Sequence, residues 1–570
     1  MASPQDGHWL DNYSNNKHPW QQSTSHNGHQ AFKRPLGLVE TSFDTDGTYF
    51  GGRADMTATL KLCTKYTLSK PALKRKVALS WTLLRLYHSL LSARVEVDQS
   101  NAKRSFAIDI PHSPAAALQE VEKSITWLED HDLDTSIDDI DLHHHALNVS
   151  RIIRPEECLS KLHVLPLKPL ADGTCELTFL IVIAHQISDG LSAYNWFSEF
   201  IRILNTRESG IDEQIKTALS PAYIKKRLPP AQEDLYPKVP GSIARQRWFW
   251  AITRVLRHVQ VPMRPTFTNP LFRDKRLGKA IPLPQTYAGV FDYSEETRPP
   301  MSSGHVTATL SAAASARLVA LCRGAKISIG AGCFALAGLA MMRIHEQRNP
   351  GSTEHAFGAS FPLNPRAFFS PMPEADSCML AFSEGILMPF LPSSLPVDKR
   401  FLLVAKHANR ELRVYQKRLK DGGQGIGSFD KHSPARLLAT GYLAQIERVD
   451  AKLPEERRTG YTPQGQLKPR VGMYGATCGV SSVGSLAAYF KSGANDLENV
   501  EQKDFVADYR SLKMGVRARE NEFLIGSSSD ADGIIAFGVS YDENAISQEA
   551  AENWAKAISG LLEEESLSKL

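Results

Sequence analysis

No two of the seven cysteines are spaced as a CxxC pair, which excludes a zinc ribbon and a dithiol redox motif. The cysteines are odd in number and mostly lie in apolar stretches, a usage typical of free thiols in a reducing compartment. Excess charge of one sign is also missing, since 66 Lys and Arg face 62 Asp and Glu and leave a formal net charge of +4. We therefore expect no nucleic-acid partner.

Long hydrophobic runs and several catalytic signatures are absent as well. The longest uncharged apolar run, 327–342, is shorter than the roughly 18 residues that a membrane-spanning helix needs, and it predicts a buried helix. The first residues contain no apolar core of a secretory signal, so we expect none. No GxSxG motif occurs, which disfavours a serine hydrolase. The glycine-rich segment 422–427 lacks the Lys and Ser/Thr of a phosphate-binding loop.

The composition, 42% hydrophobic and 22% charged over 570 residues, is that of an ordinary folded chain with more than one domain. Residues 31–204 mix strands and helices, and 301–565 resume the same pattern. Between them, 205–300 are rich in proline and contain one clear helix, at 243–259. The sequence therefore predicts an α/β protein with two layered subdomains on either side of a crossing segment.

Apolar periodicity also predicts individual elements, and the Asp532-Gly533 step between two apolar runs predicts a hairpin near the end of the chain. In the first subdomain we expect strands at 56–62, 162–167 and 177–184, and helices at 72–92 and 191–204.

The two ends of the chain carry no apolar pattern. Residues 1–30 are rich in Asn, Gln, Ser and His, so we expect a disordered tail there. The chain closes on Ser568, Lys569 and Leu570, the tripeptide that the peroxisomal import receptor reads at a free C-terminus. The residues before it are strongly polar, which favours its exposure. These features predict a peroxisomal location and binding to that receptor.

The segment that carries chemistry is HQISDG, which follows the apolar strand 177–184. A buried strand places His185 at a rigid, partly desolvated edge, and Asp189 with Gly190 opens the next helix. Imidazole, with a pKa of roughly 6.5, is suited to take the proton of an attacking hydroxyl near neutral pH. The alternative is a strand-end histidine followed by an ordinary Asp helix cap.

This segment resembles the HxxxDG signature of the CoA-dependent acyltransferase superfamily. That group includes chloramphenicol acetyltransferase, the plant BAHD enzymes and the condensation domains of peptide synthetases. Three further segments are similar to that group, namely 87–94 (its RHPLLRAR helix), 479–484 (its VSNIG segment) and 539–542 (its closing strand). The resemblance spans residues 36–560, although only HxxxDG is specific.

The resemblance implies two chloramphenicol-acetyltransferase-like subdomains with the active site in a tunnel at their interface. His185 would be the general base, Asp189 a structural residue paired with an arginine, and Gly190 a point of close backbone approach. We select Arg366, in FPLNPR, as the arginine, and Ser481 or Ser482 as the donor to the oxyanion. The resemblance also implies acyl-CoA as co-substrate, no permanently bound cofactor, no metal, and a monomer.

The sequence departs from two branches of this superfamily. Ala184 stands where peptide-forming condensation domains carry a second histidine, and the BAHD segment DFGWG is missing. Both favour the stand-alone fungal acyltransferases. We expect transfer of a short- or medium-chain acyl group to a hydroxyl of a glycolipid, as in the mannosylerythritol-lipid acyltransferases. The alternatives are a trichothecene-type O-acetyltransferase of secondary metabolism and a non-catalytic binding protein on the same fold.

Three other patterns are weaker. The triplet 143–145 of histidines beside aspartates predicts a solvated loop rather than a metal site, because consecutive side chains cannot all face one ion. The DADG at 530–533 lacks the glutamate that completes a calcium loop. The basic amphipathic helix 243–259 could make weak contact with a membrane surface or pack against the two domains, and packing is favoured.

Overall fold

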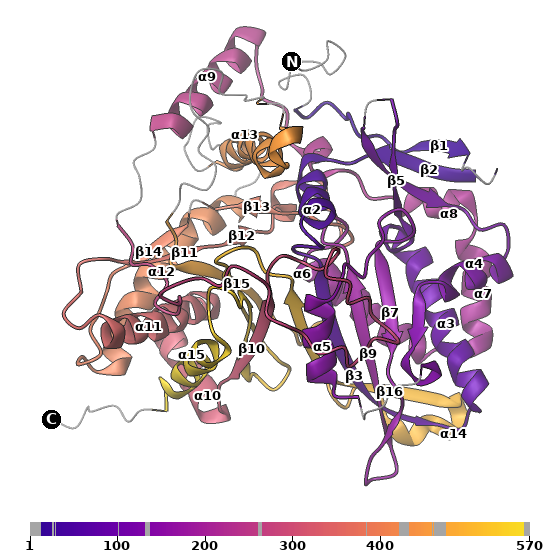
Figure 1. Ribbon diagram of the computed structural model, residues 1–570. Helices are drawn as coiled ribbons and strands as arrows, with labels where there is room; N and C mark the ends of the chain where they lie inside the picture. Colours follow the sequence, from indigo (N-terminus) through magenta and orange to yellow (C-terminus); the bar gives the residue numbers. More distant parts are fainter. Residues whose placement is uncertain are drawn as a thin grey trace.

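The computed structural model contains two mixed sheets that lie beside each other, each with helices packed on it (Figure 1). The predicted α/β fold with two subdomains is therefore confirmed. The structure describes residues 13–24, 28, 30–100, 102–131, 137–259, 265–383, 385–420, 433–458, 460 and 475–563.

The first sheet is built around β9 (Cys175–Ile183), whose last seven residues are buried. Helices α3 (Lys70–Tyr87) and α6 (Gly190–Leu204) supply the core that covers it. Phe200 of α6 packs against Trp81 of α3 and Phe179 of β9, at 5.5 and 5.2 Å between ring centroids. Each such buried aromatic ring stabilises the fold by about 1.5–3 kcal/mol. The other strands are β16 (Phe505–Val516), β3 (Met56–Tyr66), β7 (Ser160–Val164), β6 (Ile125–Trp127) and β8 (Lys168–Pro169).

A smaller sheet and three helices surround this core. Helices α4 (Pro114–Glu122) and α7 (Glu208–Ala218) lie beside α3, and α5 (Asp139–Asn148) contacts β3. The small sheet has the order β1-β2-β5-β4, with β1 (Gln21–Thr24), β2 (Gln30–Pro35), β5 (Arg104–Asp109) and β4 (Arg94–Val97).

The second sheet has its own apolar core, formed with α11 (Ile329–Arg348), the helix predicted from the longest apolar run. The Asp532-Gly533 hairpin joins β17 and β18, and Gly533 adopts φ +80°, which suits glycine. The strands, in spatial order, are β10 (Ser303–Thr309), β18 (Ile535–Asp542), β17 (Phe523–Ser529), β15 (Cys478–Ser485), β11 (Phe357–Ser360) and β14 (Ile386–Met388). Helices α10 (Ala312–Gly324), α12 (Val397–Lys420) and α15 (Gln548–Gly560) also pack in this half, whereas α14 (Val500–Lys503) lies beside β16 (Phe505–Val516) of the first sheet.

One strand crosses between the halves. β16 comes from the end of the chain but pairs antiparallel with β3 in the first sheet, as Figure 1 shows by its yellow colour among the indigo strands. Asn205, just after α6, fixes its position, because the Asn205 amide donates to the Ala507 carbonyl at 2.8 Å and accepts from its N–H at 3.0 Å. The two subdomains are therefore each discontinuous along the sequence.

The crossing segment differs from the single helix that we expected. Besides α9 (Ile243–Val259), it contains α7 and α8 (Pro221–Lys226). Ile211 and Ile215 of α7 are buried in the first core, because their spacing places both on the face toward α3. The first subdomain thus continues beyond the boundary at 204.

The predicted tail at 1–30 also differs where the structure describes it. Tyr13 is buried against Trp250 of α9, at 4.8 Å between ring centroids, and β1 pairs with β2. The backbone N–H of Lys17 and that of His18 donate to the Asp234 carboxylate. Burial of one aromatic ring and these hydrogen bonds offset the cost of ordering this polar segment. The tripeptide 568–570 lies outside the described residues, as does the glycine-rich segment 422–427.

The histidine triplet is part of α5, not of a solvated loop. Asp138 caps this helix by accepting from the N–H of Ile140, and both His143 and His145 are buried. His143 Nδ1 lies 3.0 Å from Thr59 Oγ1, and His145 Nδ1 lies 2.6 Å from Tyr293 Oη. No group of three or more potential ligand side chains that could hold a metal ion occurs among the described residues.

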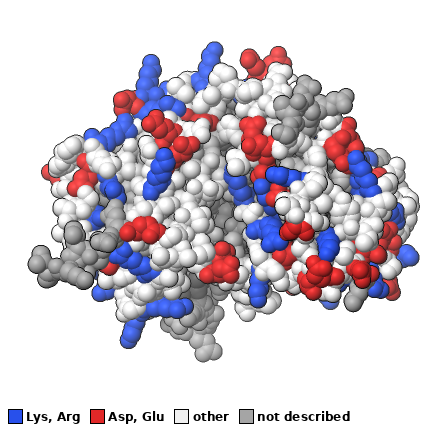
Figure 2. All heavy atoms as spheres, turned by 90° about the horizontal axis from the view of Figure 1, so that it is seen from below, with Lys and Arg blue, Asp and Glu red and all other residues white. Residues whose placement is uncertain are grey.

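No single helix in the described ranges is both long and apolar enough to cross a membrane, although α10 and α11 together pass that test as a bent pair. The surface seen from below carries acidic and basic side chains of both signs, intermixed (Figure 2).

Candidate active site

His185 sits where β9 ends and α6 begins. A tight turn reverses the chain, because the N–H of Ile187 donates to the Ala184 carbonyl at 3.1 Å and that of Ser188 to the His185 carbonyl at 3.3 Å. Asp189 then caps α6 and accepts from the N–H of Ser192 at 3.0 Å. The sequence HQISDG therefore folds as a strand, a turn and a helix start, which is the arrangement expected for it.

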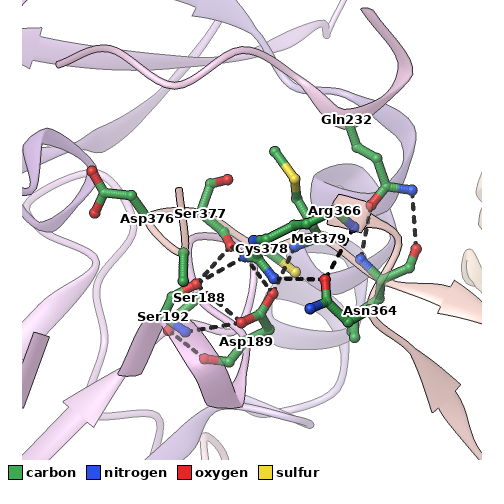
Figure 3. Close-up of polar contacts among 12 residues, drawn as sticks. Ser188, Asp189, Ser192, Gln232, Asn364, Arg366, Asp376, Ser377, Cys378 and Met379 are labelled. Carbon is green, nitrogen blue, oxygen red and sulfur yellow. Dashed lines mark hydrogen bonds and ion pairs between the residues drawn. The ribbon is translucent and has the colours of Figure 1, made fainter. Parts of the chain in front are cut away.

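Asp189 points into the protein, toward the other half of the chain (Figure 3). Its Oδ2 lies 2.8 Å from Nη2 of Arg366 and accepts from the N–H of Met379 at 3.0 Å. Arg366 Nη2 also donates to the Ser377 carbonyl at 2.6 Å, and both side chains of the ion pair are nearly fully buried. The structure thus brings together the aspartate and the arginine that the sequence analysis selected. Asp189 is held as a positioning residue, with its carboxylate engaged by protein donors.

The loop 375–379 is fixed against α6 and the end of α3. Trp196 Nε1 donates to Asp376 Oδ1 at 2.7 Å, and His88 Nδ1 lies 2.7 Å from the same oxygen. Ser192 Oγ donates to the Ser377 carbonyl at 2.7 Å. His88 belongs to segment 87–94, which is similar to a segment of the acyltransferase family. Through His88 this segment anchors the loop 375–379.

The ring of His185 stacks on Phe43 of α2 (Leu38–Tyr49), with centroids 3.9 Å apart and planes at 1°. Its Nδ1 lies 3.9 Å from Cys378 Sγ. Because Nδ1 is turned toward Cys378, Nε2 is the ring nitrogen from which a substrate proton could be accepted. Neither Phe43 nor Cys378 was predicted, and no motif or spacing in the sequence marks them.

Burial lowers the pKa of His185 to about 4, although its hydrogen bond to its own carbonyl opposes that shift and the ring keeps some exposed surface. The guanidinium of Arg519 lowers it further. The imidazole is therefore neutral at physiological pH, as a general base must be.

Arg519 belongs to a cluster around Asp46 of α2, whose side chain is fully buried. Burial raises the pKa of Asp46, but Arg519, Lys452 and Arg53 together outweigh burial and hold it below its usual range. Oδ2 of Asp46 lies 2.5 Å from Lys452 Nζ and 3.0 Å from Arg519 Nη2. Lys452 lies in α13 (Pro434–Lys452) and Arg519 in the connection from β16 to β17, so this cluster joins α2, α13 and that connection.

The two candidate serines lie on opposite faces of β15. Val480 faces the second core, and Ser482 follows the same face, since its Oγ would lie 3.4 Å from a Cβ placed on Gly330 of α11. Ser481 has the other face. A register shift between Ser482 and Gly484 follows, so the alternation does not extend to Val483, whose Cγ1 would lie 4.0 Å from a Cβ placed on Gly190. Because Ser481 faces away from the second core, we expect it, rather than Ser482, to be the oxyanion donor.

The surrounding protein leaves room for a side chain at Gly190. A Cβ placed on Gly190 would meet Met514 Cε at 3.9 Å and Val483 Cγ1 at 4.0 Å, which are ordinary contacts. If close approach requires glycine here, the approaching group is a substrate and not the protein.

Two surface pockets, of about 540 and 470 Å³, lie elsewhere. Both are lined by residues such as Arg348 of α11, and neither includes His185. The side chains that line them include no nucleophile paired with a base. We therefore take the surroundings of His185, and not either pocket, as the candidate active site. The tunnel expected at His185 stays a prediction.

No family model and no curated protein matches this sequence. Solved structures do match it. The trichothecene 15-O-acetyltransferase from Fusarium sporotrichioides superposes with a TM-score of 0.64 at 12% identity, over 96% of this chain and 97% of that one. The condensation domain of the monacolin K polyketide synthase gives a TM-score of 0.50 at 8% identity, over 93% and 96%. The chain thus has the two-subdomain fold of the CoA-dependent acyltransferases and condensation domains.

Asp189→Asn should destabilise the protein by about 3 kcal/mol, because it leaves the buried Arg366 without its countercharge. Asparagine still caps a helix, so the loss reports the ion pair and not the cap. Thermal unfolding of the single variant and of Asp189→Asn/Arg366→Gln measures the effect, and the double variant should recover part of it. An unchanged melting temperature with lost turnover would contradict the positioning role.

The pH dependence of kcat/KM should follow the free His185. Because its pKa is lowered to about 4, kcat/KM should stay level from pH 8 to pH 6 and fall as the pH drops through about 4, where the base becomes protonated. Rates measured over short intervals, with stability checked at each pH, test this. A fall centred near pH 6.5 would show that substrate reaches a solvated imidazole.

Ser481→Ala should lower kcat by about 10²-fold, the scale for removing one oxyanion donor, with little change in KM. Ser482→Ala is the matched control on the neighbouring position and should retain nearly full kcat. Equal losses for both variants would contradict the assignment by strand face.

Proposed function

We propose that this protein is an acyl-CoA-dependent O-acyltransferase with His185 as its general base. The observation that carries the proposal is the His185 imidazole at the end of β9, stacked on Phe43 and followed by a buried ion pair that reaches into the other subdomain. The fold shared with the trichothecene acetyltransferase supports the same reading.

The proposed reaction has two steps and no covalent enzyme intermediate. The acceptor hydroxyl attacks the thioester carbonyl, the C–O bond forms, and its proton passes to His185 Nε2. The tetrahedral oxyanion is stabilised by a donor from β15, for which Ser481 is the candidate. The C–S bond then breaks and the imidazolium returns its proton to the leaving CoA thiolate, which restores the neutral base.

For the acyl group and the acceptor, we propose a short- or medium-chain acyl group and a glycolipid hydroxyl, as in mannosylerythritol-lipid acylation. The peroxisomal location that residues 568–570 predict would supply this donor, because peroxisomes shorten fatty acids and so hold such acyl-CoAs. A second candidate is O-acetylation of a trichothecene-type secondary metabolite, which the likeness to the Fusarium enzyme favours. Both are transferase reactions at the same His185.

The test is release of free CoA by the purified protein. Acetyl-, hexanoyl-, decanoyl- and palmitoyl-CoA are offered with glycolipid and terpenoid alcohols. We expect acceptor-dependent release with one combination, and a loss of at least about 10²-fold in His185→Ala, the usual scale for removing a general base. The chain length that supports release separates the glycolipid enzyme from the acetyltransferase.

A matched thermal-unfolding measurement keeps the result interpretable. His185→Ala should unfold within a few degrees of the wild type, since the ring bears no part of the Asp189 network. CoA release that His185→Ala leaves unchanged would overturn the proposal in favour of a binding protein on the same fold.

A further inference from the structure

Helix α9 exposes an unusual amount of apolar surface. Five of the thirteen exposed large hydrophobic side chains of the described chain belong to this one helix of 17 residues, with Trp248 61% and Val259 62% exposed. The other three are Ile243, Val255 and Leu256. Single exposed apolar residues are normal, whereas such a concentration marks an interaction surface.

Three of these side chains, together with Ile252, form a stripe along the helix. Trp248, Ile252, Val255 and Val259 are spaced at i, i+4, i+7 and i+11, which places them on one side. We call these four residues the α9 stripe. Ile252 is half-buried, and the other three are exposed.

The opposite side of α9 is already packed. Phe249 and Trp250 are buried in a cluster with Leu438 and Tyr442 of α13, and Arg257 pairs with the buried Glu447 of the same helix. The helix is therefore fixed on the protein by one apolar side while it presents a second apolar side to solvent. The predicted packing is thus present, but it accounts for only one of the two faces.

Basic residues border the α9 stripe. By helical spacing, Arg247 and Arg254 lie along one edge and Arg245 along the other, and α9 contains no acidic residue. Arg245 and Arg247 are exposed. An apolar stripe that contains a tryptophan, with arginines at its edges, suits the boundary between lipid headgroups and acyl chains.

We propose that α9 docks the protein on an anionic lipid surface, with the α9 stripe in the headgroup boundary and the bordering arginines on lipid phosphates. The complementary charge selects this occupant. A second copy of the chain would bring two all-basic borders against each other, and such like-charge contact opposes association. The helix lies on the surface and does not span it.

The position of α9 connects this surface to the reaction site. α9 packs on α13, α13 packs on α2, and α2 carries the Phe43 ring that stacks on His185; Figure 1 shows the three helices in this order. Docking through α9 would thus leave α13 and α2 between the lipid and His185. This consequence rests on the proposed function, whereas the docking itself does not.

Co-sedimentation with vesicles tests the docking without any substrate. The full chain should sediment with phosphatidylglycerol/phosphatidylcholine vesicles, and less with phosphatidylcholine alone or at high salt. Trp248→Ser/Val255→Ser should lower the partition coefficient at least about tenfold. Arg247→Gln/Arg254→Gln should remove the preference for the anionic vesicles.

The matched control is Leu403→Ser, which removes an equally exposed hydrophobic side chain (58%) on α12 and should bind as the wild type. Absence of wild-type sedimentation, or equal binding by the Trp248→Ser/Val255→Ser variant, would overturn the proposal. So would a dimer in light scattering that this double variant abolishes. CoA release with a water-soluble acceptor should be unchanged in that variant, so failure of docking and failure of the transferase are read separately.

Discussion

The buried ion pair between Asp189 and Arg366 is the constraint on which the site depends. Two charges taken out of water are stable only when both are fully hydrogen-bonded, and here the pair is completed by Ser192, Ser377 and Met379. Those partners come from both halves of the chain. Once they are satisfied, the turn before Asp189 has little freedom, and the direction of the His185 side chain follows from it.

Strand β16 also connects the two subdomains, through the pairing of a whole strand. β16 belongs to the first sheet by pairing with β3, yet it leads directly to β17 and β18 in the second. Moving the subdomains apart would break either the β16 ladder or the Asp189 network. A site at such an interface can draw groups from both halves, as Asp189 and Arg366 illustrate, and still keep their spacing within the tolerance that catalysis requires.

The sequence predicted best what is local. The apolar strand, His185 at its end and the Asp189-capped helix follow from a pattern within about thirty residues. Arg366 came only from the family resemblance, since no spacing identifies a partner 177 residues away. Phe43, Cys378 and the pairing of β16 with β3 could not be predicted, because they depend on tertiary packing. α7 and the structure of residues 13–24 were not predicted, because both segments are mostly polar. Only a few apolar side chains, among them Ile211, Ile215 and Tyr13, fix them to the protein.

The low pKa of His185 shapes both halves of the proposed reaction. A base whose conjugate acid has a pKa of about 4 is weak, so it cannot deprotonate an alcohol before attack and must act as the C–O bond forms. The same property helps later, because a thiolate with a pKa near 8.5 takes a proton readily from such an imidazolium. The oxyanion that appears between the two steps raises the basicity of the imidazole while it exists. Desolvation therefore keeps the base available at every physiological pH and makes its protonated form short-lived.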